Sequence, residues 1–110
     1  MTENTLQLDD RGFDREITQS KGAALVDFSA EWCAPCRALG PTVDAVANDF
    51  AGRATVAKVQ VDDSPELANR FGVRSIPTLI FFRDGEEVDR VVGALSYAEL
   101  QERLSGLAAA

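Results

Sequence analysis

Residues 26–37 read Val26-Asp27-Phe28-Ser29-Ala30-Glu31-Trp32-Cys33-Ala34-Pro35-Cys36-Arg37, and they join an apolar segment to an amphipathic one. Upstream, the apolar run begins at Ala23, so residues 23–30 are predicted to form a strand covered on both faces. Downstream, apolar side chains recur every three or four residues, as on one face of a helix: Leu39, Val43, Val46 and Phe50. The two cysteines therefore lie where a buried strand passes into a helix.

Cys33 and Cys36 admit four interpretations. A zinc site needs about four ligands, and this chain, with 2 cysteines and 0 histidines, would have to share the metal with a second chain. A structural crosslink closing so short a ring stabilises a fold by roughly 2 kcal/mol, well below a long loop. Two inert buried thiols are the third interpretation. The fourth is a redox dithiol that cycles between thiol and disulfide.

The spacing of the cysteines favours the redox dithiol. Residues i and i+3 of a helix have Cβ atoms about 5–6 Å apart, and a disulfide needs about 3.8 Å, so a first helical turn can close the ring with a small adjustment. A helix that starts at Cys33 places this sulfur beside unpaired N–H groups and the positive end of the helix dipole, which favour the thiolate. Cys36, one turn further in, is better shielded and suits the role of resolving cysteine.

Composition indicates one globular domain over 1–110. The 110 residues are 45% hydrophobic and 26% charged, which is ordinary for a folded domain. A net charge of −7 argues against nucleic-acid or anionic-membrane binding. The sequence contains no run of about 18 apolar residues, and residues 1–10 show no secretory signal. We therefore expect a cytoplasmic protein without a membrane span. The absence of histidine excludes His-based triads and His-ligated metals.

The remaining segments continue an alternation of strands and helices. Four further strands are predicted at 6–8, 55–61, 76–82 and 87–92. A tight turn at Asp84-Gly85 joins the last two strands into a hairpin.

Three further helices are predicted from capping residues and apolar spacing. The first is capped at position 9 or 10, buries Phe13 and Ile17 and ends near Gly22. The second begins at 63–66 and ends near Gly72. The last follows a capping box at 96–99, and its core-facing side chains are Leu100, Leu104 and Leu107. The order β-α-β-α-β-α-β-β-α predicts an α/β fold with parallel strands, helices on both faces and an antiparallel edge.

In this order of elements, Trp32-Cys33-Ala34-Pro35-Cys36 after a buried strand resembles the thioredoxin family. Several separated segments carry the same resemblance: Val26-Asp27-Phe28, Lys58 with Asp62, Ser75-Ile76-Pro77-Thr78, Asp84-Gly85 and Gly93. The resemblance covers nearly the whole chain. It implies the thioredoxin fold, with a central mixed five-stranded β-sheet flanked by four helices.

Asp27 is a carboxyl group inside an apolar strand. Between Val26 and Phe28 we expect it to be buried, and burial raises the pKa of a carboxyl; an aspartate pointing to water at a strand edge is the alternative. The family resemblance implies that Asp27 lies beneath the dithiol and accepts a proton from Cys36. It also implies that Lys58 lies near Asp27 and holds down its pKa, whereas the local sequence fits a solvated strand face equally well.

Ile76-Pro77 opens a predicted strand, where a proline can be purely structural. The resemblance implies that this peptide bond is cis, faces the dithiol, keeps metal ions from the thiolates, and offers the backbone of Ile76 to an extended substrate peptide. A flat apolar patch around Cys33 would receive the substrate: Trp32, Ala34, Pro35, Ile76, Pro77, Val92, Gly93 and Ala94. Ordinary packing in the core or in turns is the alternative for these residues.

The activity implied by the resemblance is that of a protein-disulfide reductase, a thiol–disulfide oxidoreductase. Its catalytic residues would be Cys33, Cys36, Asp27, Pro35 and Lys58. The Cys33 thiolate attacks the disulfide of a protein substrate, and Cys36 resolves the mixed disulfide. A flavoprotein thioredoxin reductase would regenerate the dithiol with electrons from NADPH. The chain itself carries no dinucleotide fingerprint, and we expect a monomer that binds no cofactor and no metal.

Other functions fit the same fold: a non-catalytic binding or assembly subunit, a peroxidatic or transferase enzyme, and a disulfide oxidant or isomerase. The chain also departs from the family pattern at two positions. Ala34 stands where glycine is commonest, and Ser29 stands where many members carry tryptophan, which removes an aromatic lid near the dithiol. We expect these departures to affect reactivity and partner fit, and to leave the chemistry unchanged.

Overall fold

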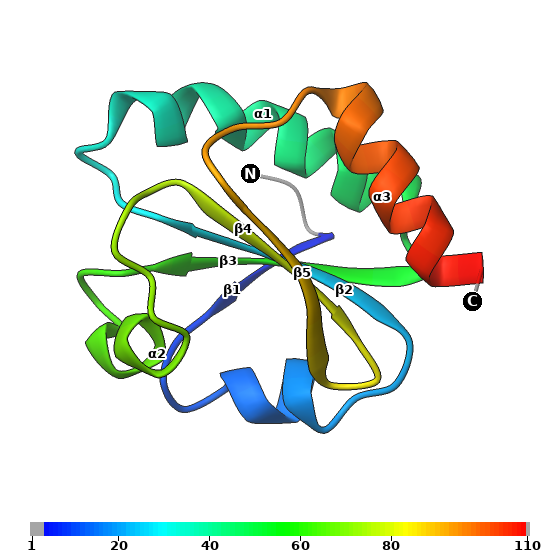
Figure 1. The fold of residues 1–110 in the computed structure, drawn as a ribbon, viewed down its shortest axis with the longest axis horizontal. Coiled ribbons are helices and arrows are strands. Elements are labelled where there is room, and N and C mark those ends of the chain that lie inside the picture. Colours follow the sequence, from blue (N-terminus) through cyan, green and yellow to red (C-terminus); the bar gives the residue numbers. More distant parts are fainter. Residues whose placement is uncertain (1–3, 110) are drawn as a thin grey trace.

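Five strands form one mixed sheet in the spatial order β1-β3-β2-β4-β5 (Figure 1). The computed structural model describes residues 4–109, and positions 1–3 and 110 of the expected domain lie outside the described residues. The strands are β1 (Thr5–Leu8), β2 (Ala23–Ser29), β3 (Ala54–Gln60), β4 (Thr78–Arg83) and β5 (Glu86–Val92). The β1–β3 and β2–β3 pairs are parallel, whereas the β2–β4 and β4–β5 pairs are antiparallel. The expected mixed sheet with an antiparallel edge is confirmed.

Helices cover both faces of the sheet. They are η1 (Asp14–Thr18), α1 (Ala34–Asp49), α2 (Pro65–Arg70) and α3 (Tyr97–Ala109). Helices α1 and α3 lie on one face, and η1 and α2 lie on the other (Figure 1). The element order matches the order predicted from the sequence. Within residues 4–109, no helix combines the length and the apolar content that crossing a membrane requires.

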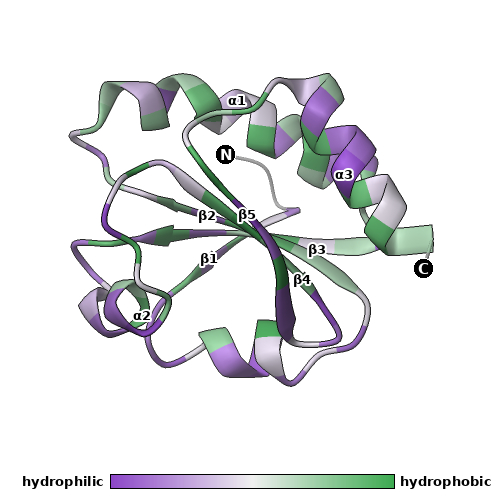
Figure 2. Cartoon of the chain, in the orientation of Figure 1, coloured by the Kyte–Doolittle hydropathy of each residue, from purple (hydrophilic) through white to green (hydrophobic). Residues whose placement is uncertain are grey.

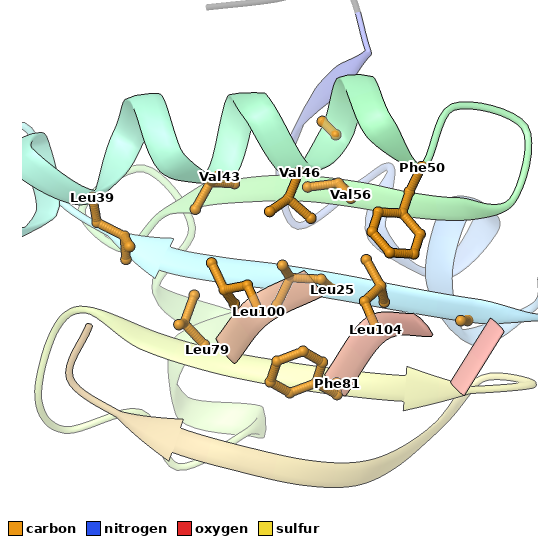
Figure 3. Close-up of a cluster of buried hydrophobic side chains, with 12 residues drawn as sticks. Leu25, Leu39, Val43, Val46, Phe50, Val56, Leu79, Phe81, Leu100 and Leu104 are labelled. Carbon is orange, nitrogen blue, oxygen red and sulfur yellow. The ribbon is translucent and has the colours of Figure 1, made fainter. Parts of the chain in front are cut away.

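The core under α1 and α3 follows from the twofold alternation of the strands and the helical spacing of the apolar residues. Leu25 and Phe81 point from β2 and β4 toward the two helices, and Val26 and Ile80 point to the opposite face. Figure 3 shows how the apolar stripe of α1 meets the sheet and α3: Leu39, Val43, Val46, Phe50, Val56, Leu79, Leu100 and Leu104 are all buried there. The helix spacing read from the sequence therefore predicts the contact face of α1 correctly.

The opposite face is closed by aromatic packing. Phe71, which follows α2, lies 5.3 Å from Phe13 and 5.6 Å from Phe82 between ring centroids, and its ring is 6.0 Å from that of Phe28. Tilted and edge-on ring pairs at such distances add to the burial of apolar area. The edge strand β5, in contrast, is coloured hydrophilic over much of its length in Figure 2, which suits a strand whose edge faces solvent.

The sheet face under α1 changes from apolar to polar along β2 and β3. Leu25 pairs with Val56 in the core. Toward the carboxyl ends of these two parallel strands, the same face carries two polar pairs: Asp27 with Lys58, and Ser29 with Gln60. Ligands and reacting groups of open α/β sheets gather at this end of the strands, and here the polar pairs lie directly before the cysteine motif.

The Asp84-Gly85 turn locks the β4–β5 hairpin against the end of η1. Gly85 has a φ of 87°, and a Cβ atom built there would overlap the carbonyl oxygen of Thr18. Only glycine tolerates both the backbone conformation and the close approach. The Asp84 side chain accepts a hydrogen bond of 2.7 Å from the N–H of Gly22, and the Asp84 N–H donates to the Gly22 carbonyl at 2.9 Å.

Most element ends agree with the sequence, and two differ. The first helix is reduced to the five residues of η1, because Asp9 caps a turn before it by accepting hydrogen bonds from the N–H groups of Arg11 and Gly12. Strand β4 starts at Thr78, after Pro77, which has no N–H to give to a strand ladder. The capping box is confirmed, since Ser96 and Glu99 exchange backbone-to-side-chain bonds of 3.0 and 3.1 Å.

Candidate active site

Cys33 and Cys36 form a disulfide at the start of α1, with their Cα atoms 5.2 Å apart. Cys33 is the N-cap residue, with extended backbone, and Pro35 lies in the first turn. The backbone N–H of Cys36 donates to the Sγ of Cys33 at 3.2 Å. The sulfur thus takes the place of the oxygen of an N-capping serine or aspartate, and it lies at the positive end of the helix dipole. Both cysteines are buried in the disulfide form, at 6% and 5% exposed.

The segment before β4 contacts the dithiol from the other side. The Sγ of Cys33 lies 3.9 Å from the carbonyl oxygen of Ile76, and the Ile76–Pro77 peptide bond is cis. The N–H of Gly93 donates to the carbonyl of Pro77 at 2.8 Å, and Val92 pairs with Thr78. The structure therefore brings the beginning of β4 and the end of β5 to the same edge as the cysteines.

Apolar side chains lie open to solvent beside the disulfide. Trp32 is 68% exposed and Val92 is 63% exposed. Ala34 and Pro35 are exposed on the first turn of α1, whereas Ile76 is half-buried and Pro77 is buried. Ala94 is exposed in the loop to α3, and only its chain neighbours place it near this edge. The Nε1 of Trp32 donates to Oδ2 of Asp62 at 2.7 Å, which fixes the ring beside Cys33.

Asp27 is a buried carboxyl group near the carboxyl end of β2. It is 1% exposed, and its Oδ1 finds no hydrogen-bond partner among the residues that the structure describes. Burial raises the pKa of Asp27 to about 7, although the charge of Lys58 opposes this rise and the charge of Asp44 adds to it. Asp27 and Cys36 line the same cavity, of about 500 Å³. The expectation of a buried aspartate is confirmed, and the solvated strand edge is wrong.

Lys58 is paired and largely buried, so the solvated strand face is also wrong for this residue. Its Nζ lies 3.1 Å from Oδ1 of Asp44, and the two side chains are 12% and 15% exposed. Thr5 of β1 donates a hydrogen bond of 2.8 Å to the same carboxylate oxygen. Asp44 was not predicted as a site residue. In the sequence Asp44 is marked only by its place in α1, next to the buried apolar residue Val43 and four residues after Gly40.

The cavity extends from Asp27 toward solvent. Ser29 and Gln60 line it further along the strands, and the exposed Glu31 and Arg37 lie at its rim. The side chains of Ser29 and Gln60 approach each other to 3.5 Å. The small hydroxyl side chain at position 29 therefore lines the cavity and does not cover it with an aromatic ring. Nowhere in residues 4–109 do three His, Cys, Asp or Glu side chains gather as a metal site would require.

A disulfide at a helix N-terminus, with a buried carboxyl on the cavity that one of its cysteines lines and exposed apolar side chains nearby, defines a thiol–disulfide oxidoreductase. Comparison with known proteins agrees with this class. The thioredoxin family profile matches residues 4–106. The chain belongs to the thioredoxin family.

Named relatives cover most of this chain. It is 48% identical over 86 residues to a thioredoxin of Chlorobaculum thiosulfatiphilum, covering 78% of this chain and 80% of the relative. It is 44% identical over 98 residues to thioredoxin 1 of a Nostoc species, covering 89% and 92% of the two chains. A thioredoxin of Porphyra purpurea is 42% identical over 99 residues, covering 90% of this chain and 92% of the relative.

Proposed function

We propose that this chain reduces disulfides of protein substrates. The Cys33 thiolate attacks one sulfur of the substrate disulfide, which forms the mixed disulfide and releases the other substrate sulfur as a thiolate. Cys36 then loses its proton and attacks the Sγ of Cys33, which releases the second substrate thiol and leaves the Cys33–Cys36 disulfide. The substrate gains two electrons and the dithiol loses two. The observation that carries the proposal is the N–H of Cys36 that donates to the Cys33 sulfur, where a thiolate would be stabilised.

Asp27 is proposed as the acceptor of the Cys36 proton. A carboxyl whose pKa is about 7 can both accept and return a proton at neutral pH. Asp27 and Cys36 line the same cavity, which supports a proton transfer between them. Lys58, in register with Asp27 on the neighbouring strand, favours the carboxylate form. Pro35 contributes by fixing the first turn of α1, on which both sulfurs depend.

Substrates are proposed to dock as extended peptides on the apolar patch beside Cys33. Trp32 and Val92 supply exposed apolar area, and the carbonyl of Ile76 lies 3.9 Å from the attacking sulfur. Backbone groups there can pair with a substrate whatever its side chains are, which suits a reductase of many proteins. Ala34, Pro77, Gly93 and Ala94 complete the proposed patch.

We propose that a flavoprotein thioredoxin reductase, which draws electrons from NADPH, re-reduces the disulfide. The chain would act in the cytoplasm, as a monomer that binds no cofactor itself. The family membership supports this part of the proposal. A measured reduction potential below that of the glutathione pool would support a reductase, because electrons would then pass from this dithiol to substrate disulfides. A potential near those of disulfide oxidants or isomerases would reverse the direction.

Reduction of insulin by dithiothreitol tests the proposal directly. We expect the wild type to accelerate precipitation of the insulin B chain and Cys33→Ser to match the uncatalysed rate. Equal rates for the two proteins would show a binding subunit in place of an enzyme. The Cys36→Ser variant should accumulate mixed disulfides with substrate proteins, because the resolving thiol is missing. A measurement with NADPH and a thioredoxin reductase then tests the electron source separately.

A further inference from the structure

We propose that Asp44 is a positioning residue of the redox site, which holds the ammonium group of Lys58 and thereby limits how strongly that cation can stabilise the Asp27 carboxylate. The inference rests on the proposed role of Asp27 as proton acceptor. It concerns a residue of α1 about two turns further along the helix than Cys36, which lines the same cavity.

The position of Lys58 is defined from three elements. Its strand neighbour in register is Asp27 of β2, so both side chains leave the sheet on the face that α1 covers. The Nζ then meets α1 at two positions four residues apart. It lies 3.1 Å from Oδ1 of Asp44, and a Cβ atom at Gly40 would be 3.6 Å from it. The ammonium group therefore lies close against the helix between these two positions.

Asp44 is itself held from a third direction. The hydroxyl of Thr5 on β1 donates to Oδ1 of Asp44 at 2.8 Å, the same oxygen that contacts Lys58. A carboxylate with a hydrogen-bond donor and a cation on one oxygen has little freedom to move. The ion pair is also nearly removed from solvent, with 12% and 15% of the two side chains exposed, so salt and water screen it weakly.

Few other charges face Asp27. Lys58 comes from β3, Asp44 and the Cys36 sulfur come from α1, and β4 presents Leu79 opposite Asp27. Glu31 and Arg37 stand at the exposed rim of the cavity. The balance at Asp27 is therefore mainly between one cation and one anion that are bound to each other. Lys58 lowers the pKa of Asp27 and Asp44 raises it, which agrees with the geometry.

The sign of the effect of Asp44 follows from this arrangement. Removing its charge takes away a like charge near Asp27 and frees the ammonium group of Lys58 to turn toward the Asp27 carboxyl, which has an oxygen without a partner. Both changes favour the carboxylate. Asp27 in Asp44→Asn should therefore ionise at lower pH than in the wild type.

The experiment uses the oxidised protein, in which the cysteines do not titrate and no histidine interferes near neutral pH. The carboxyl carbon of Asp27, identified as the NMR resonance lost in Asp27→Asn, is followed from pH 4 to 9. We expect its midpoint to fall by about half to one pH unit in Asp44→Asn. The exposed Glu66 provides the matched control, because Glu66→Gln removes the same charge away from the cavity and should leave the midpoint unchanged.

An unchanged midpoint in Asp44→Asn, or an equal shift in Glu66→Gln, would overturn the inference. Asp44→Ala gives a second test with the same expected direction, and thermal melts of both variants report whether the fold is kept. A separate measurement follows the rate at which Cys36 resolves a mixed disulfide against pH. If the Asp27 midpoint moves and this rate profile does not, the inference on Asp44 holds and Asp27 is not the proton acceptor of the proposed function.

Discussion

The backbone N–H of Cys36 donates a hydrogen bond to the Sγ of Cys33, the residue that caps helix α1. The same two residues are also joined by the disulfide. We expect this hydrogen bond to persist in the reduced dithiol, because the N–H belongs to the first turn of the helix and not to the disulfide. It gives the two cysteines different environments. Cys33 has a donor and the helix dipole at its sulfur, whereas Cys36 lines the cavity that Asp27 also lines.

Alkylation of the reduced protein should discriminate between the two thiols. At pH 7 we expect iodoacetamide to modify Cys33 at least about tenfold faster than Cys36, since the N–H donor and the helix dipole at its sulfur favour the thiolate. Peptide mass mapping after brief exposure measures the ratio. Equal rates at the two positions would contradict the division into attacking and resolving cysteine.

Asp27 should make the stability of the oxidised protein depend on pH. The pKa of Asp27 is raised to about 7 from an ordinary value of 3.8, so the native state disfavours the charged form. Below pH 4 the carboxyl is protonated in both states and carries no penalty. Between pH 4 and 7 only the unfolded state ionises, so this group increasingly destabilises the fold, and above pH 7 the penalty is constant at no more than about 4 kcal/mol.

Comparison with Asp27→Asn isolates this contribution. The free energy of unfolding of the variant minus that of the wild type should increase from pH 4 to 7 and then level off. A fixed cost of burying the amide shifts the whole curve and does not change its shape. Urea unfolding at pH 4, 5.5, 7 and 8 measures the difference. A difference that stays flat across this range would mean that Asp27 ionises normally in the folded protein.

The fold was largely predictable because its signals are local and repeated. The apolar run 23–30, the stripe of α1 and the Asp84-Gly85 turn each determine an element from a few adjacent residues, and all three elements are present. The start of β4 was predicted two residues early because Ile76 and Pro77 are apolar like the strand, yet they turn to the dithiol. Apolar character alone does not separate a strand from a segment that packs against a site.

The site residues that lie in one short sequence motif could be predicted. Those that only folding brings together were harder to predict. Cys33 and Cys36 are neighbours in sequence, and Asp27 stands out as a charge in an apolar strand. Asp44 has no such contrast, since a carboxylate on the border of an amphipathic helix usually faces water. Its role depends on the rotation of α1 over β3, which brings it to Lys58 and Thr5. That rotation is set by the packing of the core and not by adjacent residues.

Gly85→Ala should destabilise the protein by more than about 3 kcal/mol. A methyl group at this position would overlap the Thr18 carbonyl, and the backbone has a φ of 87°, so the strain of a left-handed residue adds to a backbone displacement. The β4–β5 turn would have to move away from η1, with loss of the bonds between Asp84 and Gly22. Urea unfolding measures the loss.

Gly52→Ala is the matched control for this prediction. Gly52 has a similar φ of 81°, but a Cβ atom there meets nothing within 4 Å. Its substitution should therefore cost only the conformational strain, about 1 kcal/mol. Similar losses for the two variants would show that backbone conformation alone explains Gly85, and that the close approach to Thr18 contributes nothing.

The bond from Trp32 to Asp62 should contribute to substrate docking and not to the chemistry. The indole is 68% exposed, yet its N–H donates to Asp62 at 2.7 Å, so the ring is held in place beside Cys33 without being packed in the core. Asp62→Leu removes the acceptor, and the ring loses this anchor. We expect the KM for a protein disulfide to rise several-fold, corresponding to about 1 kcal/mol for one solvent-exposed hydrogen bond, with kcat nearly unchanged.

Trp32 is the only tryptophan in the chain, so its fluorescence anisotropy reports the release of the ring without interference. In Asp62→Leu the anisotropy should fall while the melting temperature stays close to that of the wild type. Asp63→Leu removes a neighbouring exposed carboxylate that does not bind the indole and serves as the control for charge. If Asp63→Leu raised KM as much as Asp62→Leu, general electrostatics would explain the effect, and the orientation of Trp32 would not.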